Sequence, residues 1–150
     1  MILCIDPGTT CAGWAGFSKE DKALLRCGLV RGSDWIETAK NLPAFSECDT
    51  LIIEDPRIYP ASKARANDIM KLAKSVGAFV ASVDAAYTKL VTPATWKKSI
   101  PKLIHQKRIM RALTDSELAI LNGCQCPKSL LHNTVDAVGI GLWYVRRYRA

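Results

Sequence analysis

The sequence lacks any long uninterrupted apolar run, because charged residues break its hydrophobic stretches every few positions. A helix that spans a bilayer is therefore not expected. It also lacks internal repeats and low-complexity tracts, and no basic segment precedes the apolar MILCID start, which argues against a secretory signal. What remains is an ordinary globular balance, with 49% hydrophobic and 23% charged residues among 150. This balance predicts one domain, residues 1–150, with a substantial core.

Cysteine is present, but the spacing of a zinc site is missing. The six cysteines include Cys124 and Cys126, and no second cysteine or histidine pair stands at ligand spacing from them. Cys4 and Cys27 lie in apolar, strand-like runs, where a free thiol behaves as a small hydrophobic side chain. We therefore expect reduced cysteines and a cytoplasmic protein, in a bacterial cell or a phage-infected host.

Positive charge exceeds negative charge, with 21 lysines and arginines against 14 acids and a formal net charge of +7. Such a balance suits an anionic partner, most commonly nucleic acid, although a merely soluble basic protein would also show it. Clustering favours nucleic acid. The clustered residues are Lys97, Lys98, Lys102, Lys107, Arg108, Arg111, Arg146, Arg147 and Arg149.

Three short apolar runs open the chain, at residues 2–6, 11–18 and 24–31, and predict a three-stranded antiparallel meander. Helical and strand-like patterns then alternate, which favours later strands parallel to the first. These elements are strands at 50–54 and 89–92, both expected to be buried, and helices at 34–46, 61–86, 102–113, 115–121 and 133–148. The pattern predicts an α/β protein with a mixed five-stranded sheet flanked by helices, an order that several folds share.

Two of these helices carry distinct apolar faces. From Ile69 to Val83, apolar residues recur at spacings of three and four, which predicts one continuous stripe. If the protein forms a dimer, this helix is expected to contribute to the interface, because the stripe is larger than one sheet face requires. The helix at 102–113 has its expected apolar side at Leu103, Ile104, Ile109, Met110 and Leu113.

Acidic residues end two of the apolar strands. If the strands are parallel neighbours, Asp6 and Glu54 emerge at one end of the sheet. Asp136 lies in the first turn of the last helix, with His132 one turn earlier and Asn133 three residues earlier. Each acid alone also fits a strand-end turn or a helix start. Together they predict a site for two Mg²⁺ ions, because clustered carboxylates need a cation and two such ions hydrolyse phosphodiesters.

Three segments resemble RuvC-type Holliday junction resolvases, which belong to the RNase H-like, or retroviral-integrase, superfamily. They are ILCIDPGTTCAGWAGF at 2–17, LIIED at 51–55 and HNTVDAVGIGLWYV at 132–145, in the family's order and at its spacing. The resemblance implies an RNase H-like fold and an endodeoxyribonuclease that resolves four-way junctions with Mg²⁺, for which Mn²⁺ substitutes. The small size is similar to that of bacteriophage members.

By this resemblance Asp6, Glu54 and Asp136 are catalytic metal ligands. The family often has an acid or a histidine three residues before the last aspartate, where this chain has Asn133. Either Asn133 supplies a neutral oxygen ligand, or His132, displaced by one position, ligates the ion or orients the nucleophilic water. We favour His132 over the alternative that it only caps or packs.

The family also places lysines near the scissile phosphate. Lys107 is the candidate for the lysine that steadies developing charge. In the loop after the catalytic glutamate, Arg57 is a candidate phosphate ligand and Tyr59 could stack on an unpaired base, with packing into the protein as the alternative. The other residues expected to bind DNA are Lys97, Lys98, Lys102, Arg108 and Arg111.

Other functions are compatible with parts of the pattern. DPGTT resembles the phosphate-binding turn of actin-like ATPases, but these need two domains and a second phosphate loop. A non-catalytic DNA-binding module would normally have lost one of the acids. A nuclease for flaps, forks or hybrids is a serious rival, because the acids say little about DNA shape. Two symmetric incisions in a four-way junction would require a two-fold homodimer, and no membrane partner is expected.

Overall fold

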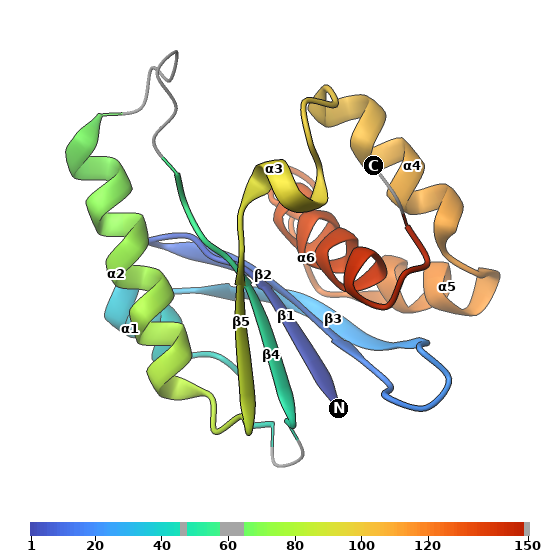
Figure 1. Ribbon diagram of the computed structural model, residues 1–150, viewed down its shortest axis with the longest axis horizontal. Coiled ribbons are helices and arrows are strands. Elements are labelled where there is room, and N and C mark those ends of the chain that lie inside the picture. Colours follow the sequence, from blue (N-terminus) through green and yellow to red (C-terminus); the bar gives the residue numbers. More distant parts are fainter. Residues whose placement is uncertain (46–47, 58–64, 149–150) are drawn as a thin grey trace.

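The computed structural model describes residues 1–45, 48–57 and 65–148, which form a five-stranded sheet between two groups of helices (Figure 1). Strands β1 (Ile2–Asp6), β2 (Cys11–Phe17) and β3 (Leu24–Arg31) form the antiparallel meander. Strands β4 (Thr50–Glu54) and β5 (Tyr87–Val91) continue the sheet from β1 in parallel, which gives the order β3-β2-β1-β4-β5. The predicted α/β class and mixed sheet are confirmed.

Helices cover both faces of the sheet (Figure 1). On one face lie α1 (Trp35–Lys40) and α2 (Ala66–Ser82), which contact each other. On the other face α6 (Leu131–Tyr144) crosses β1 and β2, with α4 (Lys102–Ala112) packed against it and α5 (Asp115–Gly123) against β3. A short helix that the sequence did not indicate, α3 (Pro93–Trp96), connects β5 to α4. None of the described helices is long and apolar enough to cross a membrane.

Each face of the sheet has its own hydrophobic core, because side chains alternate along a strand. In β1, Leu3 and Ile5 pack towards α2, whereas Cys4 packs towards α6. The α6 side is the more deeply covered: all residues of 134–142 are buried. Cys4 and Cys27 are buried free thiols, as expected from their apolar surroundings.

Strand β5 corrects one expectation. The pattern at 89–92 predicted a buried strand, but β5 is an edge strand in which only Val91 is buried and Leu90 is 51% exposed. An apolar run does not reveal how many neighbours a strand has, and β5 pairs with β4 alone.

Helix α4 corrects a second expectation. Leu103 and Ile104, assigned to its apolar side, are 75% and 48% exposed. The face that is buried carries His105 and Ile109, one turn apart. The helix therefore turns a histidine, rather than Leu103 and Ile104, towards the core.

The long helix is also shorter than its pattern suggested. α2 begins at Ala66, residues 61–64 lie outside the described part of the chain, and the helix ends at Ser82, where Val83 adopts an extended backbone. Of the predicted apolar stripe, Val76 and Phe79 are buried. Ser75 ties the helix to the β1–β2 turn by donating a hydrogen bond to the carbonyl oxygen of Gly8 at 2.9 Å. The rest of the stripe is partly exposed.

Candidate active site

Two acidic side chains leave the sheet at the ends of neighbouring parallel strands. β1 pairs with β4 up to Ile5 opposite Ile53, and one further step along this register sets Asp6 beside Glu54. Both acids stand on the same face as Cys4, which belongs to the core under α6. The prediction that the two acidic strand ends are parallel neighbours is confirmed.

The third acid, Asp136, reaches this edge because α6 lies very close to the sheet. Gly13 pairs with Asp6, and a Cβ atom on Gly13 would lie 2.0 Å from the backbone oxygen of Asn133 in α6. Any larger residue at position 13 would push the helix away. Asp136 is consequently only 6% exposed, one turn beyond this contact.

The charges of the three carboxylates act on one another. Burial raises the pKa of Asp6 well above its ordinary value, and the charges of Glu54 and Asp136 raise it further, against Lys97 and Lys102, which lower it. The Oδ1 atom of Asp136 is buried and accepts no hydrogen bond from any described residue. A buried carboxylate oxygen without a donor is unfavourable, so the cluster has acceptor capacity to spare for a cation.

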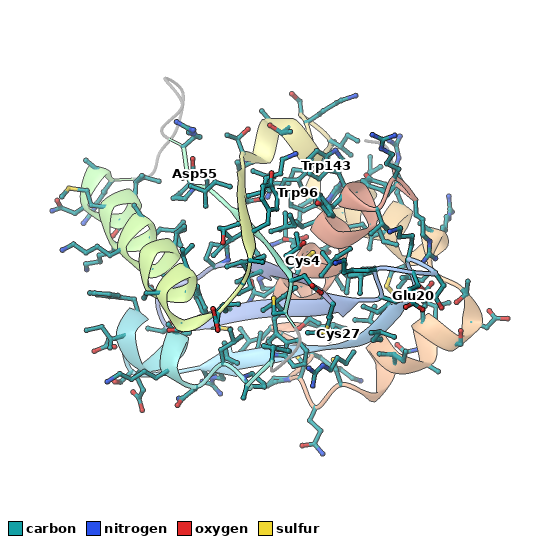
Figure 2. All side chains as sticks on the ribbon, turned by 60° about the horizontal axis from the view of Figure 1, so that its bottom comes forward. Cys4, Glu20, Cys27, Asp55, Trp96 and Trp143 are labelled. Atoms are coloured by element: carbon teal, nitrogen blue, oxygen red, sulfur yellow. The ribbon has the colours of Figure 1, made fainter. Side chains whose placement is uncertain are left out.

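Two side chains around the short helix α3 hold Glu54. The indole nitrogen of Trp96, which is fully buried, donates to Glu54 Oε2 at 2.6 Å, and Lys97 Nζ lies 3.1 Å from the same oxygen. Burial alone would lower the pKa of Lys97, but Glu54 and Asp6 outweigh it and the pKa is raised. Figure 2 shows Trp96 on the α6 side of the sheet, where it packs against Gly139.

A cavity of about 250 Å³ opens next to Asp136. Lys102, which is half exposed, places its Nζ atom 3.7 Å from Asp136 Oδ2 at this cavity. Its remaining lining residues are Lys97, Lys98, Ile100 and His105. The predicted DNA-binding lysines 97 and 102 therefore lie against the acids themselves, and Lys98 lies beside them.

His105 is a site residue that sequence reasoning missed. It is 1% exposed, its Nδ1 lies 2.8 Å from the hydroxyl of Tyr148, and its Nε2 has no hydrogen-bond partner among the described residues. Burial lowers its pKa, Lys97 acts in the same direction, and Asp136 opposes them. The only signal available in the sequence was its position three residues after Lys102.

His132 lies in a different cavity, a groove of about 530 Å³ between α4 and α6 that Lys107 also lines. Asn133 points towards the start of β2, where its Nδ2 atom donates to the sulfur of Cys11 at 3.4 Å. Within the described residues no hydrogen bond or ion pair joins His132, Asn133 or Lys107 to the three acids. The structure thus brings together the acids but not these three candidates.

The remaining basic candidates are spread more widely. Arg57 forms an ion pair with Asp55 at 2.9 Å, just beyond the end of β4, where Figure 2 shows Asp55. Arg111 lines the same groove as His132, and Arg108 is exposed on α4. Tyr59 lies outside the described residues.

The oxygen-rich donor set fits a hard divalent cation shared with a substrate. Across residues 1–45, 48–57 and 65–148, no three histidine, cysteine or acidic side chains are grouped closely enough to hold a metal ion by themselves. Mg²⁺ usually takes one or two carboxylates, keeps several waters and completes its shell with phosphate oxygens. The mutual repulsion at Asp6 and the partnerless Asp136 Oδ1 match such an open, shared site.

The sheet order β3-β2-β1-β4-β5 and the helices on both faces are those of an RNase H-like fold. Among solved structures the chain is similar to RuvC from Thermus thermophilus, with a TM-score of 0.55, 15% identity, and coverage of 97% of this chain and 95% of that one. For the same protein in complex with a Holliday junction substrate, the TM-score is 0.50, the identity 16% and the coverage 97% and 94%.

Fowlpox virus resolvase, in complex with substrate Holliday junction DNA, is similar as well, with a TM-score of 0.58, 17% identity, and coverage of 97% of this chain and 96% of that one. No protein-family model and no curated protein sequence matches the chain. The likeness to resolvases that three short segments indicated is confirmed as a likeness of fold over nearly the whole chain.

Proposed function

We propose that this chain is a structure-selective DNA endonuclease that resolves four-way junctions by metal-dependent hydrolysis of phosphodiester bonds. The observation that carries the proposal is the convergence of Asp6, Glu54 and Asp136 at one edge of the sheet, beside a cavity lined by lysines. The fold likeness to two resolvases, each with a structure in complex with Holliday junction DNA, supports the choice of substrate.

In this proposal Asp6, Glu54 and Asp136 hold two Mg²⁺ ions per site, or Mn²⁺ in their place. Bound ions would supply activation of a water and stabilisation of the leaving oxygen. The chain itself supplies the burial that keeps the carboxylates in place. Trp96 fixes the orientation of Glu54 through its 2.6 Å hydrogen bond.

Lys97 and Lys102 have two roles in the proposed site. Without metal, their ammonium groups partly neutralise Glu54 and Asp136. Once the carboxylates are ligated, the same ammonium groups are free to bind the oxygens of the scissile phosphate. The flanking DNA backbone would be bound by the remaining basic candidates, which are Arg57, Lys98, Lys107, Arg108 and Arg111.

The nucleophilic water needs a group that orients it, and two histidines compete for this role. His132 keeps the role that the family resemblance implies, with Asn133 as the alternative ligand. His105 lines the Asp136 cavity, and its buried Nε2 atom has no hydrogen-bond partner among the described residues, whereas His132 lines the neighbouring groove. Replacing each by glutamine and comparing cleavage rates decides between them, and a loss confined to His105→Gln would reject His132.

A nuclease acting on flaps, forks or hybrid duplexes is the second candidate. The three acids favour it equally, because they determine phosphodiester hydrolysis and not the shape of the DNA.

A four-way junction requires two symmetric cuts, so we also propose a two-fold homodimer with one site per chain. Helix α2 is the proposed contact, since its apolar residues include Met70, which is 58% exposed. A strictly monomeric mass with and without junction DNA would reject the dimer.

Cleavage of a synthetic four-way junction, a flap, a hybrid and a linear duplex, compared in Mg²⁺ and in EDTA, tests the proposal. We expect the junction to be cut fastest and all cutting to stop in EDTA. Asp84→Asn, which removes an exposed acid beyond α2, is the matched control for Asp6→Asn and should cleave normally. Full activity in EDTA would reject metal dependence, and faster cutting of flaps or hybrids would select the second candidate.

A further inference from the structure

A second pocket with basic and aromatic walls lies between β5 and the end of α6. Its volume is about 330 Å³, and its lining residues are Lys89, Trp143, Tyr144, Arg146 and Tyr148. Figure 2 shows Trp143 on the same side of the sheet as Trp96. None of the roles proposed above uses this pocket.

The two rings and the lysine form a surface that suits a nucleotide. Lys89 Nζ lies 5.6 Å from the ring centroid of Trp143 and 5.8 Å from that of Tyr144. Both rings pack partly against the core, which fixes them, and both remain partly exposed. Every base has an apolar face that stacks on such rings, and the phosphate beside it attracts the cation.

The backbone at Arg146 determines which substitution tests the pocket best. Arg146, two residues beyond the end of α6, lies in the left-handed region with φ of 64°. Its N–H donates to Trp143 O at 3.0 Å, and the N–H of Arg147 donates to Leu142 O at 2.8 Å. This is the helix ending in which glycine is favoured. An arginine here is conformationally less favourable than glycine, so Arg146→Gly removes the side chain without straining the backbone.

The pocket lies about two turns of α6 away from the three acids. Asp136 and Trp143 are two turns apart on one face of α6, which separates them by about 10 Å along the helix axis. Lys89 is two residues before Val91, which pairs with Glu54. Stacked nucleotides advance about 3.4 Å each along a strand, so the pocket is about three nucleotides from the acids.

We infer that this pocket binds an unpaired nucleotide of a DNA strand, with the base on Trp143 and the phosphate between Lys89 and Arg146. The inference rests on the proposed function only for the nature of the ligand, and it needs no cleavage. Unpaired nucleotides arise where duplex arms meet or fray, and a site at this distance would hold the strand beyond the scissile phosphate.

Fluorescence anisotropy of a labelled short oligothymidylate, measured in EDTA, tests this binding without any cleavage. We expect Trp143→Leu and Arg146→Gly each to weaken binding by about fivefold or more. Arg146→Gly is the sharper variant, because glycine suits the backbone there and the thermal unfolding midpoint should stay the same or rise. The matched control is Lys22→Gly, which also removes one positive charge at a left-handed residue, with φ of 63°, in the β2–β3 turn.

Three results would overturn the inference. The first is equal affinity of Arg146→Gly and Lys22→Gly for the oligomer. The second is an equal loss on single strand and perfect duplex, which would leave only general electrostatic attraction. The third is competition by free thymidine monophosphate at the affinity of the oligomer, which would make the pocket a mononucleotide site. Absence of junction cleavage in the unmodified protein would reject the proposed function and leave the anisotropy result unaffected.

Discussion

Glu117 and Asp6 are both acidic residues on the α6 side of the sheet, and their surroundings act on them in opposite directions. Glu117, 2% exposed, receives both terminal nitrogens of Arg147 at 2.5 and 2.6 Å and the backbone N–H groups of Leu24 and Thr114 at 2.7 and 2.9 Å. These donors, Arg147 first, lower its pKa to about 2. Burial and two neighbouring carboxylates instead raise the pKa of Asp6.

The contrast separates a carboxylate whose oxygens all receive hydrogen bonds, and which links parts of the fold, from the carboxylates of the proposed metal site. Glu117 joins β3, the start of α5 and the end of the chain, and each of its oxygens has several donors. The acids at the strand ends have fewer donors than acceptors, and one oxygen of Asp136 has none among the described residues. Strongly perturbed carboxylates of the second kind are typical of functional sites.

The largest expected effect is a loss of cleavage activity when one of the three acids Asp6, Glu54 and Asp136 is replaced. Asp6→Asn, Glu54→Gln and Asp136→Asn should each lower junction cleavage by more than about 100-fold, because each removes a proposed ligand of ions that would stabilise the reaction by several kcal/mol. Junction affinity should stay the same or rise, since a negative charge near phosphate is removed. Gel cleavage and binding assays measure both. Near-normal cleavage by any one variant would remove that residue from the site.

Replacing Glu117 is expected to lower the stability of the protein and to leave the activity of each folded molecule unchanged. Glu117→Gln leaves the Arg147 guanidinium partly buried without its charged partner, and should lower the free energy of unfolding by about 3 kcal/mol. Residual cleavage by the folded fraction should be normal. Urea unfolding followed by circular dichroism measures the change, and the exposed Glu20→Gln is the control, expected to change little. A stability loss no larger than that of the control would contradict the structural role.

The pH dependence of stability sharpens the same comparison. The pKa of Glu117 is about 2 in the folded protein against an ordinary 4.5, so its stabilising contribution, about 3 kcal/mol, is complete above pH 4.5 and is lost as pH falls towards 2. The difference in unfolding free energy between the unmodified protein and Glu117→Gln should shrink over this interval. Urea titrations between neutral pH and pH 3 follow it. A difference that stays constant with pH would show that Glu117 is not charged when buried.

The smallest expected effect concerns charges that would only attract DNA. Lys107→Ala should weaken junction binding and reduce the slope of log affinity against log salt concentration by about 0.9, the contribution of one phosphate contact on duplex DNA. Cleavage should slow along with binding. Titrations at several salt concentrations measure the slope. An unchanged slope would place Lys107 outside the DNA interface.

The two strand-end acids were predictable because their surroundings form a pattern. ILCID and LIIED each combine a buried strand with an acid at its end, and the alternation of helices and strands makes these strands parallel neighbours. The rotation of α6 about its own axis was harder to predict. The direction in which His132 and Asn133 point depends on how α6 is rotated where it contacts Gly13, and that rotation has no signature in the sequence.

Trp96 and His105 were missed for a related reason. Each is a single residue without a motif, and each reaches the site only because α3 and α4 fold back over α6. The exposure of β5 and of Leu103 could not be predicted from the sequence either. Apolar spacing indicates which face of an element is hydrophobic, but not which other element covers that face. Local order was therefore predictable, and the contacts between distant elements were not.

The wide separation of the three acids along the chain has a consequence for when the site can exist during folding. Asp6 and Glu54 meet only after β4 has paired in parallel with β1, and Asp136 joins them only after α6 has docked on both strands. Such non-local contacts form slowly, and loop closure must precede them. A complete but incompletely folded chain would accordingly carry all of the basic residues proposed to bind DNA, yet lack the assembled acidic site that is proposed to cut it.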